Sequence, residues 1–226
     1  MPDLLESGIY TIAEAAYLVG ISERKARGWI SGYDKYKLIP MIENEIGWSG
    51  NHLALSFKNL LEMRFISFFE DAGVHINHIR SIMDEVRVIT STDHPFSTDI
   101  VFQTDGRKIV GSIIKKYSSP KIYDPRTKNL EMFPVVYDSL KHDIEFDFNG
   151  DARLWFPRKH IAPNVIIHPK FAFGKPIIKD FQIPTQAIAS AVKVEGSQAA
   201  VAEIFDIPVK YVRQAVKFEA ELRLAA

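Results

Sequence analysis

Basic side chains with the spacing of a DNA-reading helix gather between residues 22 and 37. This stretch holds five Lys or Arg residues and two acidic ones, a local charge of +3. At about 100° per residue, the polar face of a helix here holds Arg24, Arg27, Gly28 and Ser31, with Lys25 at its boundary. The opposite face holds Ala26, Trp29 and Ile30. Arginines on such a face can contact phosphates or guanine edges. The residues that we expect to contact DNA are Ser22, Arg24, Lys25, Arg27, Ser31, Lys35 and Lys37.

Two short helices and a tight turn would position this face. Thr11 followed by Glu14 fits a capping box that starts the first helix, and Gly20 ends it. Ser22 is a favourable N-cap for a second helix that runs to about Ser31. This pair has the residue pattern of a helix-turn-helix, a motif in which the second helix enters the DNA major groove. An ordinary amphipathic helix pair with solvated charges would show the same periodicity, so both interpretations stay open at this point.

A hairpin is predicted directly after the two helices. Residues 38–45 and 52–57 read as strands, and residues 47–51 form the turn signal between them. A hairpin that follows a recognition helix is a wing, which lies against the DNA backbone or the minor groove. Trp48 at the tip could contact DNA, but we expect it to pack back on the core.

Two more helices are expected before residue 92. Ser56 is expected to cap the first, which ends near Gly73, and the second begins near Asn77. Their acidic residues are typical of a solvated face, and they are Glu62, Glu70, Asp71, Asp84 and Glu85.

The order of these elements resembles the winged-helix DNA-binding domain of MerR-type regulators. The resemblance covers about residues 9–88 and is carried by ISERKARGW, the wing, and LSFKNLLEMRFISFFEDAGVHINHIRSIM. A long coiled-coil helix and a metal-sensing Cys set are missing downstream. The resemblance therefore implies DNA binding but not a MerR effector half.

Residues 93–160 alternate apolar and polar residues in short stretches, which predicts a small antiparallel sheet. The expected strands are 100–102, 108–114, 130–137, 143–148 and 153–156, with a hairpin signal at Asp105-Gly106. Asp143, Glu145 and Asp147 would face one side of a strand, and Ile144, Phe146 and Phe148 would supply its buried face. They could bind a divalent cation, meet a basic partner protein, or lie on the solvent side of an edge strand. Neither His142 nor His160 adds a metal-ligand spacing.

The C-terminal stretch begins with two extended segments punctuated by Pro and Gly, and three helices follow. We expect the helices to begin at Pro184, after the N-cap Ser197, and at Pro208. Shifted by 186 residues, this stretch matches the first helix pair, which predicts a second helix-turn-helix. Its last helix carries a possible second face for DNA or a partner protein: Lys210, Arg213 and Lys217.

Residues 164–222 also resemble a known family. The run IIHPKFAFGKPIIKDFQIPTQAI…GSQAAVAEIFDIPVKYVRQAVKFEAEL is similar to the domain of unknown function 433, except that residues 180–182 replace its usual Gly-Thr-Arg. Joined to a MerR-like domain, this domain is the arrangement of some VapB-type antitoxins. The resemblance implies a DNA-binding antitoxin that neutralises a PIN-like ribonuclease toxin and represses its own operon, most simply as a homodimer on operator DNA.

Composition limits the alternatives. The 226 residues hold 28 basic and 28 acidic side chains, and 46% of them are hydrophobic, which excludes a disordered tail and a histone-like coat. Without Cys, the chain has no disulfide framework, thiolate zinc site or Cys nucleophile. The acidic start and the short apolar runs predict a cytoplasmic protein without a signal peptide or membrane span. We expect no cofactor, metal site or catalytic residue.

The expected fold class is α+β, in three regions. Residues 1–92 would form a winged helix-turn-helix with extra helices, residues 93–160 a small central antiparallel sheet, and residues 161–226 a trihelical helix-turn-helix-like domain. Their net charges are −3, +1 and +2. The alternatives are a stand-alone transcriptional regulator whose central sheet senses a ligand, and an enzyme that uses Asp143, Glu145, Asp147 or His160.

Overall fold

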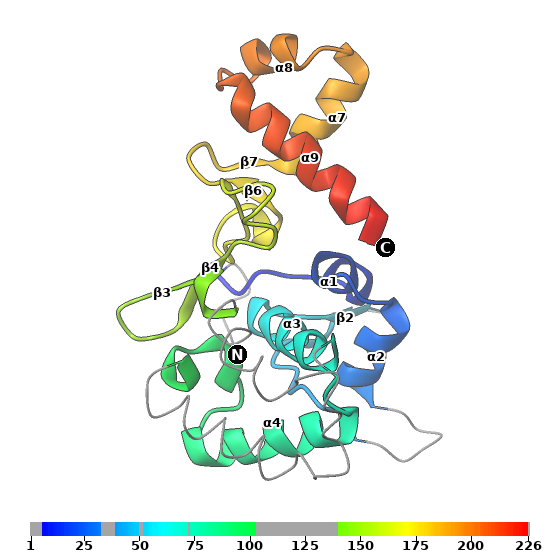
Figure 1. Cartoon of the computed structure of the whole chain (residues 1–226), viewed down its shortest axis with the longest axis vertical. Coiled ribbons are helices and arrows are strands. Elements are labelled where there is room, and N and C mark those ends of the chain that lie inside the picture. Colours follow the sequence, from blue (N-terminus) through cyan, green and yellow to red (C-terminus); the bar gives the residue numbers. More distant parts are fainter. Residues whose placement is uncertain (1–5, 33–38, 50–51, 72, 103–139, 226) are drawn as a thin grey trace. The chain divides into compact units, whose positions relative to one another are not determined.

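The computed structural model describes residues 6–32, 39–49, 52–71, 73–102 and 140–225, and within them the chain is a mixed α+β protein (Figure 1). The helices are α1 (Ile12–Val19), α2 (Glu23–Ser31), α3 (Phe57–Asp71), α4 (Ile76–Thr90), α7 (Thr185–Glu195), α8 (Gln198–Ile204) and α9 (Val209–Ala225). Short 3-10 helices span Pro95–Ser97, Ile100–Phe102 and Ala172–Gly174. None of the helices in these ranges is long and apolar enough to cross a membrane.

The strands are short and form small sheets. They are β1 (Gly47–Ser49), β2 (His52–Ala54), β3 (Ile144–Phe146), β4 (Ala152–Trp155), β5 (Val165–Ile166), β6 (Ile177–Ile178) and β7 (Ile183–Pro184). β1 pairs with β2, β3 pairs with β4, and β5, β6 and β7 form a three-stranded antiparallel sheet.

The chain forms two compact units. One combines residues 1–26, 45–57 and 153–226, and the other combines residues 27–44 and 58–152. These units do not follow the three regions expected from the sequence, because segments from both ends of the chain share the first unit. The three-region division stays a prediction about the sequence.

Helix α1 begins and ends as its sequence predicts. The Thr11 hydroxyl accepts the backbone N–H of Glu14, and the Glu14 carboxylate accepts the backbone N–H of Thr11 at 2.8 Å. Gly20 closes the helix with φ +84°, a left-handed conformation that glycine adopts without steric cost. Ile12, Ala15, Ala16 and Leu18 form the buried face.

The second unit has an apolar core around α3 and α4. On α4, the buried residues Ile79, Ile82, Met83 and Val86 follow the helical period. The Phe65 ring of α3 stacks on Phe96. The expected helices are therefore confirmed, with α3 beginning one residue after Ser56 and α4 capped by His75.

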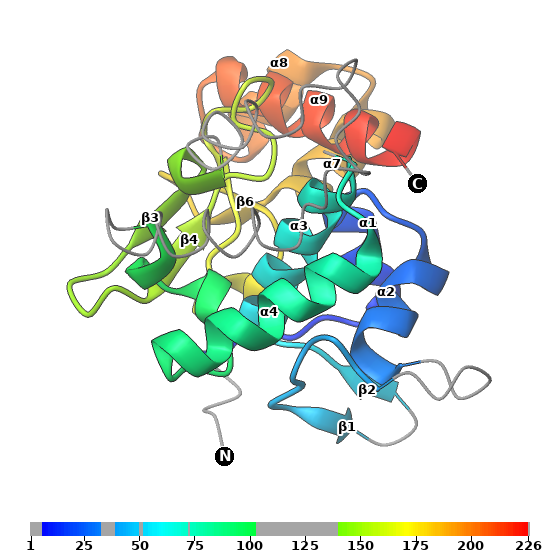
Figure 2. The same ribbon diagram turned by 60° about the horizontal axis from the view of Figure 1, so that its bottom comes forward.

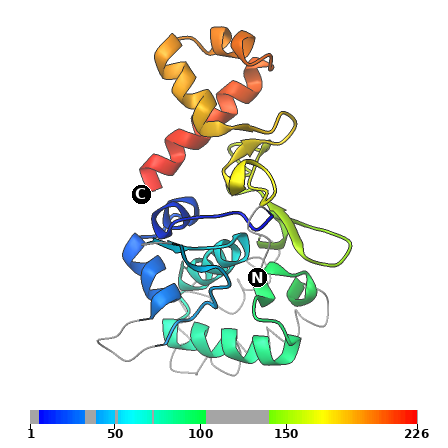
Figure 3. The ribbon, with the colours of Figure 1, turned by 180° about the vertical axis from the view of Figure 1, so that it is seen from behind.

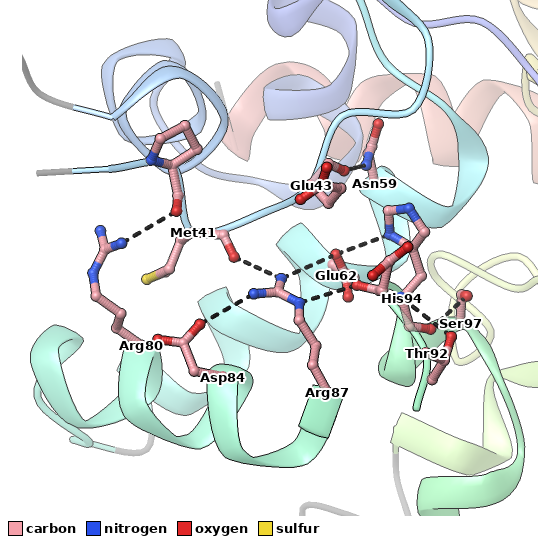
Figure 4. A network of polar contacts seen from close by, with 12 residues as sticks. Met41, Glu43, Asn59, Glu62, Arg80, Asp84, Arg87, Thr92, His94 and Ser97 are labelled. Carbon is pink, nitrogen blue, oxygen red and sulfur yellow. Dashed lines mark hydrogen bonds and ion pairs between the residues drawn. The ribbon is translucent and has the colours of Figure 1, made fainter. Parts of the chain in front are cut away.

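The expectation of a solvated face is wrong for Glu62, which is fully buried on α3. Its Oε2 lies 3.2 Å from Nδ1 of His94 and 3.9 Å from Nη2 of Arg87 (Figure 4). Arg87 also donates to the carbonyls of Met41 at 2.7 Å and Asp93 at 3.0 Å. A carboxylate can be buried only with such partners, because an uncompensated buried charge costs several kcal/mol. We call Glu62, Arg87 and His94 the buried triad.

The central region differs from expectation at two places. Residues 100–102 form a 3-10 helix rather than a strand, with Val101 and Phe102 buried. Phe148 was expected to be buried, but it is 96% exposed, because the strand ends at Phe146 and residues 147–151 form a turn. The expected strands at 143–148 and 153–156 correspond to β3 and β4. Those at 108–114 and 130–137, and the Asp105-Gly106 hairpin, lie outside the described residues.

The C-terminal helices agree closely with the sequence. Pro184 is the N-cap of α7, and the Ser197 hydroxyl accepts the Ala200 N–H to cap α8. α9 follows Pro208, and these three helices lie together in Figures 1 and 3 (orange to red). The core of this bundle includes Ile188, Val201, Val212, Ala215 and Phe218, all buried.

Hydrogen bonds join residues 9–10 to residues 173–174, the segment before β6. The Tyr10 hydroxyl donates to the carbonyl of Gly174 at 2.9 Å, and the Ile9 N–H donates to the carbonyl of Phe173. Gly174 has φ +84°, and a Cβ there would overlap the Tyr10 hydroxyl. The backbone of Tyr10 also bonds Leu55 in both directions, at 2.9 and 3.0 Å. Tyr10 therefore ties three separate stretches into one unit.

Candidate nucleic-acid interface

Helix α2 divides its side chains between a buried and an exposed face, as its sequence predicts. Ala26, Trp29 and Ile30 are 0 to 4% exposed. The exposed set holds the expected contact residues that the structure describes: Ser22, Arg24, Lys25, Arg27 and Ser31. Gly28, expected on the polar face, is buried. The remaining two, Lys35 and Lys37, lie outside the described residues.

Ser22 combines two roles at the start of α2. Its hydroxyl oxygen accepts the backbone N–H of Lys25 at 3.3 Å, which caps the helix as expected. A serine hydroxyl still has one proton to donate after accepting a hydrogen bond. A phosphate oxygen near this helix start would be a suitable acceptor, since the N-terminal end of a helix favours anions.

The end of α2 is fixed by the segment that follows it. The backbone N–H groups of Met41 and Ile42 both donate to the carbonyl of Trp29, at 2.7 and 3.1 Å. Arg80 of α4 donates to the carbonyl of Ile39, and Arg87 holds Met41. The last turn of α2 is thus connected through hydrogen bonds to Met41, which Arg87 of the buried triad holds in turn (Figure 4 shows the Arg87–Met41 contact).

The hairpin exists, but it begins later than expected. β1 starts at Gly47, inside the expected turn, and Trp48 pairs with Leu53 (Figure 2). Residues 39–44 form no strand. The expectation that Trp48 packs on the core is wrong, because its side chain is 69% exposed.

The second basic face lies on α9. Lys210, Arg213 and Lys217 are exposed, and Tyr211, Val212, Ala215, Phe218 and Leu222 of the same helix are buried. Nζ of Lys210 lies 4.7 Å from the centre of the Tyr211 ring, a cation–π distance. The three cations can therefore meet an anionic partner without disturbing the helix packing.

Two of the three acidic residues expected on one strand face, Asp143 and Asp147, have structural partners. Asp143 pairs with Arg64 of α3 at 2.8 Å, and Asp147 accepts the N–H groups of Asn149 and Asp151 to shape the turn after β3. These contacts give Asp143 and Asp147 structural roles: Asp143 links to α3, and Asp147 stabilises the turn. Across the part of the chain that the structure describes, no group of three His, Cys, Asp or Glu side chains could hold a metal ion.

The sequence comparison gives one relative with a named role. No family model matches the chain. Among curated proteins, the chain is similar to "Putative antitoxin VapB45" of Mycobacterium tuberculosis, with 21% identity over 223 residues and 92% of each protein covered.

The structural comparison shows the fold. The chain is similar to the X-ray crystal structure of Rv2018 from Mycobacterium tuberculosis, with a TM-score of 0.73 and 19% identity. The match covers 92% of this chain and 96% of the other. The chain therefore has the fold of Rv2018 and is similar, over nearly its whole length, to a protein named as an antitoxin.

Proposed function

We propose that the chain is an antitoxin that neutralises a ribonuclease toxin of the PIN-like class. The observation that carries this proposal is the similarity to VapB45, which extends over 92% of both chains rather than over one shared module. The class of toxin rests only on the resemblance of residues 164–222 to the domain of unknown function 433 that the sequence suggests, and no family model matches the chain.

The test of this part is co-purification from the native host. The tagged full chain should retain a small protein encoded next to its own gene, and that protein should degrade RNA once separated. A neighbouring protein that never binds the chain, in cells expressing both, contradicts the antitoxin proposal. If a small molecule then changes the affinity of the chain for DNA, the stand-alone regulator becomes the better account.

We further propose that the chain represses its own operon as a winged helix-turn-helix dimer on a symmetric operator. The exposed cations of α2 support a recognition helix, and the exposed Trp48 supports a wing in contact with DNA. Arg24, Lys25 and Arg27 would contact phosphates or bases, and Ser22 and Ser31 would donate hydrogen bonds. Helix α9 would offer a second basic surface to DNA or to the partner protein, formed by Lys210, Arg213 and Lys217.

Fluorescence anisotropy on a duplex from upstream of the gene tests the DNA part. Replacing both Arg24 and Arg27 by Ala should weaken binding at least tenfold. If both arginines contact phosphates, the slope of log K against log salt should also fall by about 1.8, since each lost contact removes about 0.9. Lys193→Ala, an exposed cation on α7 outside both faces, is the matched control. If the double variant kept the same affinity for the duplex and the same salt slope, α2 would not be the helix that contacts DNA.

A further inference from the structure

A cavity of about 290 Å³ lies within the first unit, walled by α1 on one side and by α7 and α9 on the other. Ligand pockets in proteins begin at about 300 Å³, so this volume suits a small molecule or one long side chain. It lies outside the proposed contact residues of α2 and α9. No local sequence pattern indicates this cavity, because its two walls are more than 150 residues apart in the chain.

Two carboxylates and one ammonium group stand in the cavity wall: Glu14, Glu219 and Lys175. The Glu14 carboxylate is fixed by the N–H and the hydroxyl of Thr11, at 2.8 and 3.0 Å. Glu219 accepts the hydroxyl of the fully buried Thr185. Both acids are therefore held in place before any ligand arrives, which lowers the entropy cost of binding.

Most of the remaining wall is aromatic or apolar, and Thr185 and Gln186 are its uncharged polar residues. Tyr17 and Leu18 of α1 and Leu222 of α9 contribute to it, together with two prolines. Burial and, to a smaller extent, the charge of Glu14 raise the pKa of the lining residue Tyr10 far above its usual range, so its ring stays neutral. Apolar walls with a few fixed charges are typical of sites for organic ions that carry a hydrocarbon stem.

The charged side chains that line the cavity favour a positively charged ligand over a negatively charged one. The helix α7 begins at this cavity with Thr185, but the N–H of Thr185 is already bonded to the carbonyl of Pro176 at 3.0 Å. An anion would meet two fixed carboxylates and one exposed lysine, whereas a cation would meet net negative charge.

We propose that this cavity binds a compact organic cation, a guanidinium or alkylammonium group on a short apolar stem, with Glu14 and Glu219 as its counter-charges. This proposal stands independently of DNA binding and of the toxin. The same chemistry can arrive as a free small molecule or as an arginine side chain of a peptide, and the experiment separates the two.

The probes are n-butylguanidinium and n-butylurea, which share shape and stem but differ in charge. Isothermal titration or NMR shifts of the full chain should show saturable binding of n-butylguanidinium and much weaker binding of n-butylurea. Nα-acetylarginine methylamide serves as the peptide arm. Tighter binding of the free guanidinium assigns the site to a small molecule, and tighter binding of the blocked arginine assigns it to a side chain.

Matched variants test the assigned residues. Glu14→Gln keeps the capping box and Glu219→Gln keeps an acceptor for Thr185, so both should fold, which a thermal melt checks. Each should weaken n-butylguanidinium binding roughly two- to fivefold, and Lys175→Ala should strengthen it by a similar factor. Glu203→Gln on α8, which does not line the cavity, should change nothing. Absence of saturable binding, equal affinity for n-butylurea, or indifference to all three lining variants would overturn the proposal.

Discussion

Replacing Arg87 by Met would remove one cation from the buried triad while keeping much of the apolar stem of the side chain. Glu62 is fully buried, and its carboxylate lies 3.9 Å from the Arg87 guanidinium and 3.2 Å from the His94 ring. The variant leaves a buried carboxylate with one of these two partners. It also removes the hydrogen bonds of Arg87 to the carbonyls of Met41 and Asp93.

The expected cost follows from these distances. At 3.9 Å and an effective dielectric constant near 20, two unit charges attract by about 4 kcal/mol. Breaking a buried pair by removing one partner typically costs about 3 to 5 kcal/mol, because the other charge remains desolvated. We therefore expect Arg87→Met to lower the free energy of unfolding by about 3 to 4 kcal/mol.

Arg80→Met is the matched control. Arg80 lies two turns earlier on α4 and donates to the carbonyls of Ile39 and Pro40, but the described contacts give it no buried acid. It should cost about 1 kcal/mol, the usual value of a partly exposed hydrogen bond. Adding Glu62→Gln to Arg87→Met removes the stranded charge, so the double variant should recover part of the loss.

The assay is urea unfolding of the full chain, followed by circular dichroism, for the wild type and these variants. The reasoning is refuted if Arg87→Met costs no more than Arg80→Met. It is also refuted if Glu62→Gln adds its full destabilisation to that of Arg87→Met, because a buried charge pair requires the two effects to be coupled.

Two further predictions concern the first unit. Gly174→Ala should lower the free energy of unfolding, measured in urea, by about 2 to 4 kcal/mol, because Gly174 has φ +84° and its new Cβ would overlap the Tyr10 hydroxyl. Gly196→Ala is the control: Gly196 has φ +67° and open space around the new Cβ, so the free energy of unfolding should fall by about 1 kcal/mol. Burial, followed by two nearby cations, lowers the pKa of His168, so the folded chain resists a proton that the unfolded chain binds near pH 6.5. Stability should therefore fall as the pH drops below about 6.5, and His168→Gln should reduce this loss relative to the wild type. Equal costs for the two glycine variants, or a pH slope of His168→Gln equal to that of the wild type, would contradict these assignments.

The local part of the fold was predictable from the sequence because its signals are short. Three helix starts have a hydroxyl that accepts a backbone N–H of the first turn, from Thr11, Ser22 and Ser197. The fourth starts after Pro184, which has no backbone N–H of its own. Neighbouring residues therefore suffice to place these helix starts. The same holds for the exposed face of α2, since a helical period fixes which residues share a side.

The parts that could not be predicted depend on contacts between distant residues. Nothing within one turn of Glu62 indicates burial, because its partners Arg87 and His94 follow 25 and 32 residues later. Tyr10 bonds Gly174 across 164 residues, and the cavity is lined by residues 9–18 together with residues 175–222. At Ile100–Phe102, three apolar residues were too few to separate a strand from a 3-10 turn.

The measurement that tests the central proposal most directly is the growth of a host that expresses the neighbouring reading frame, with and without this chain. The proposal predicts that the neighbour alone arrests growth and that co-expression of the full chain restores it. A neighbour that is harmless alone, or one whose toxicity this chain does not relieve although both proteins accumulate, would contradict the antitoxin function.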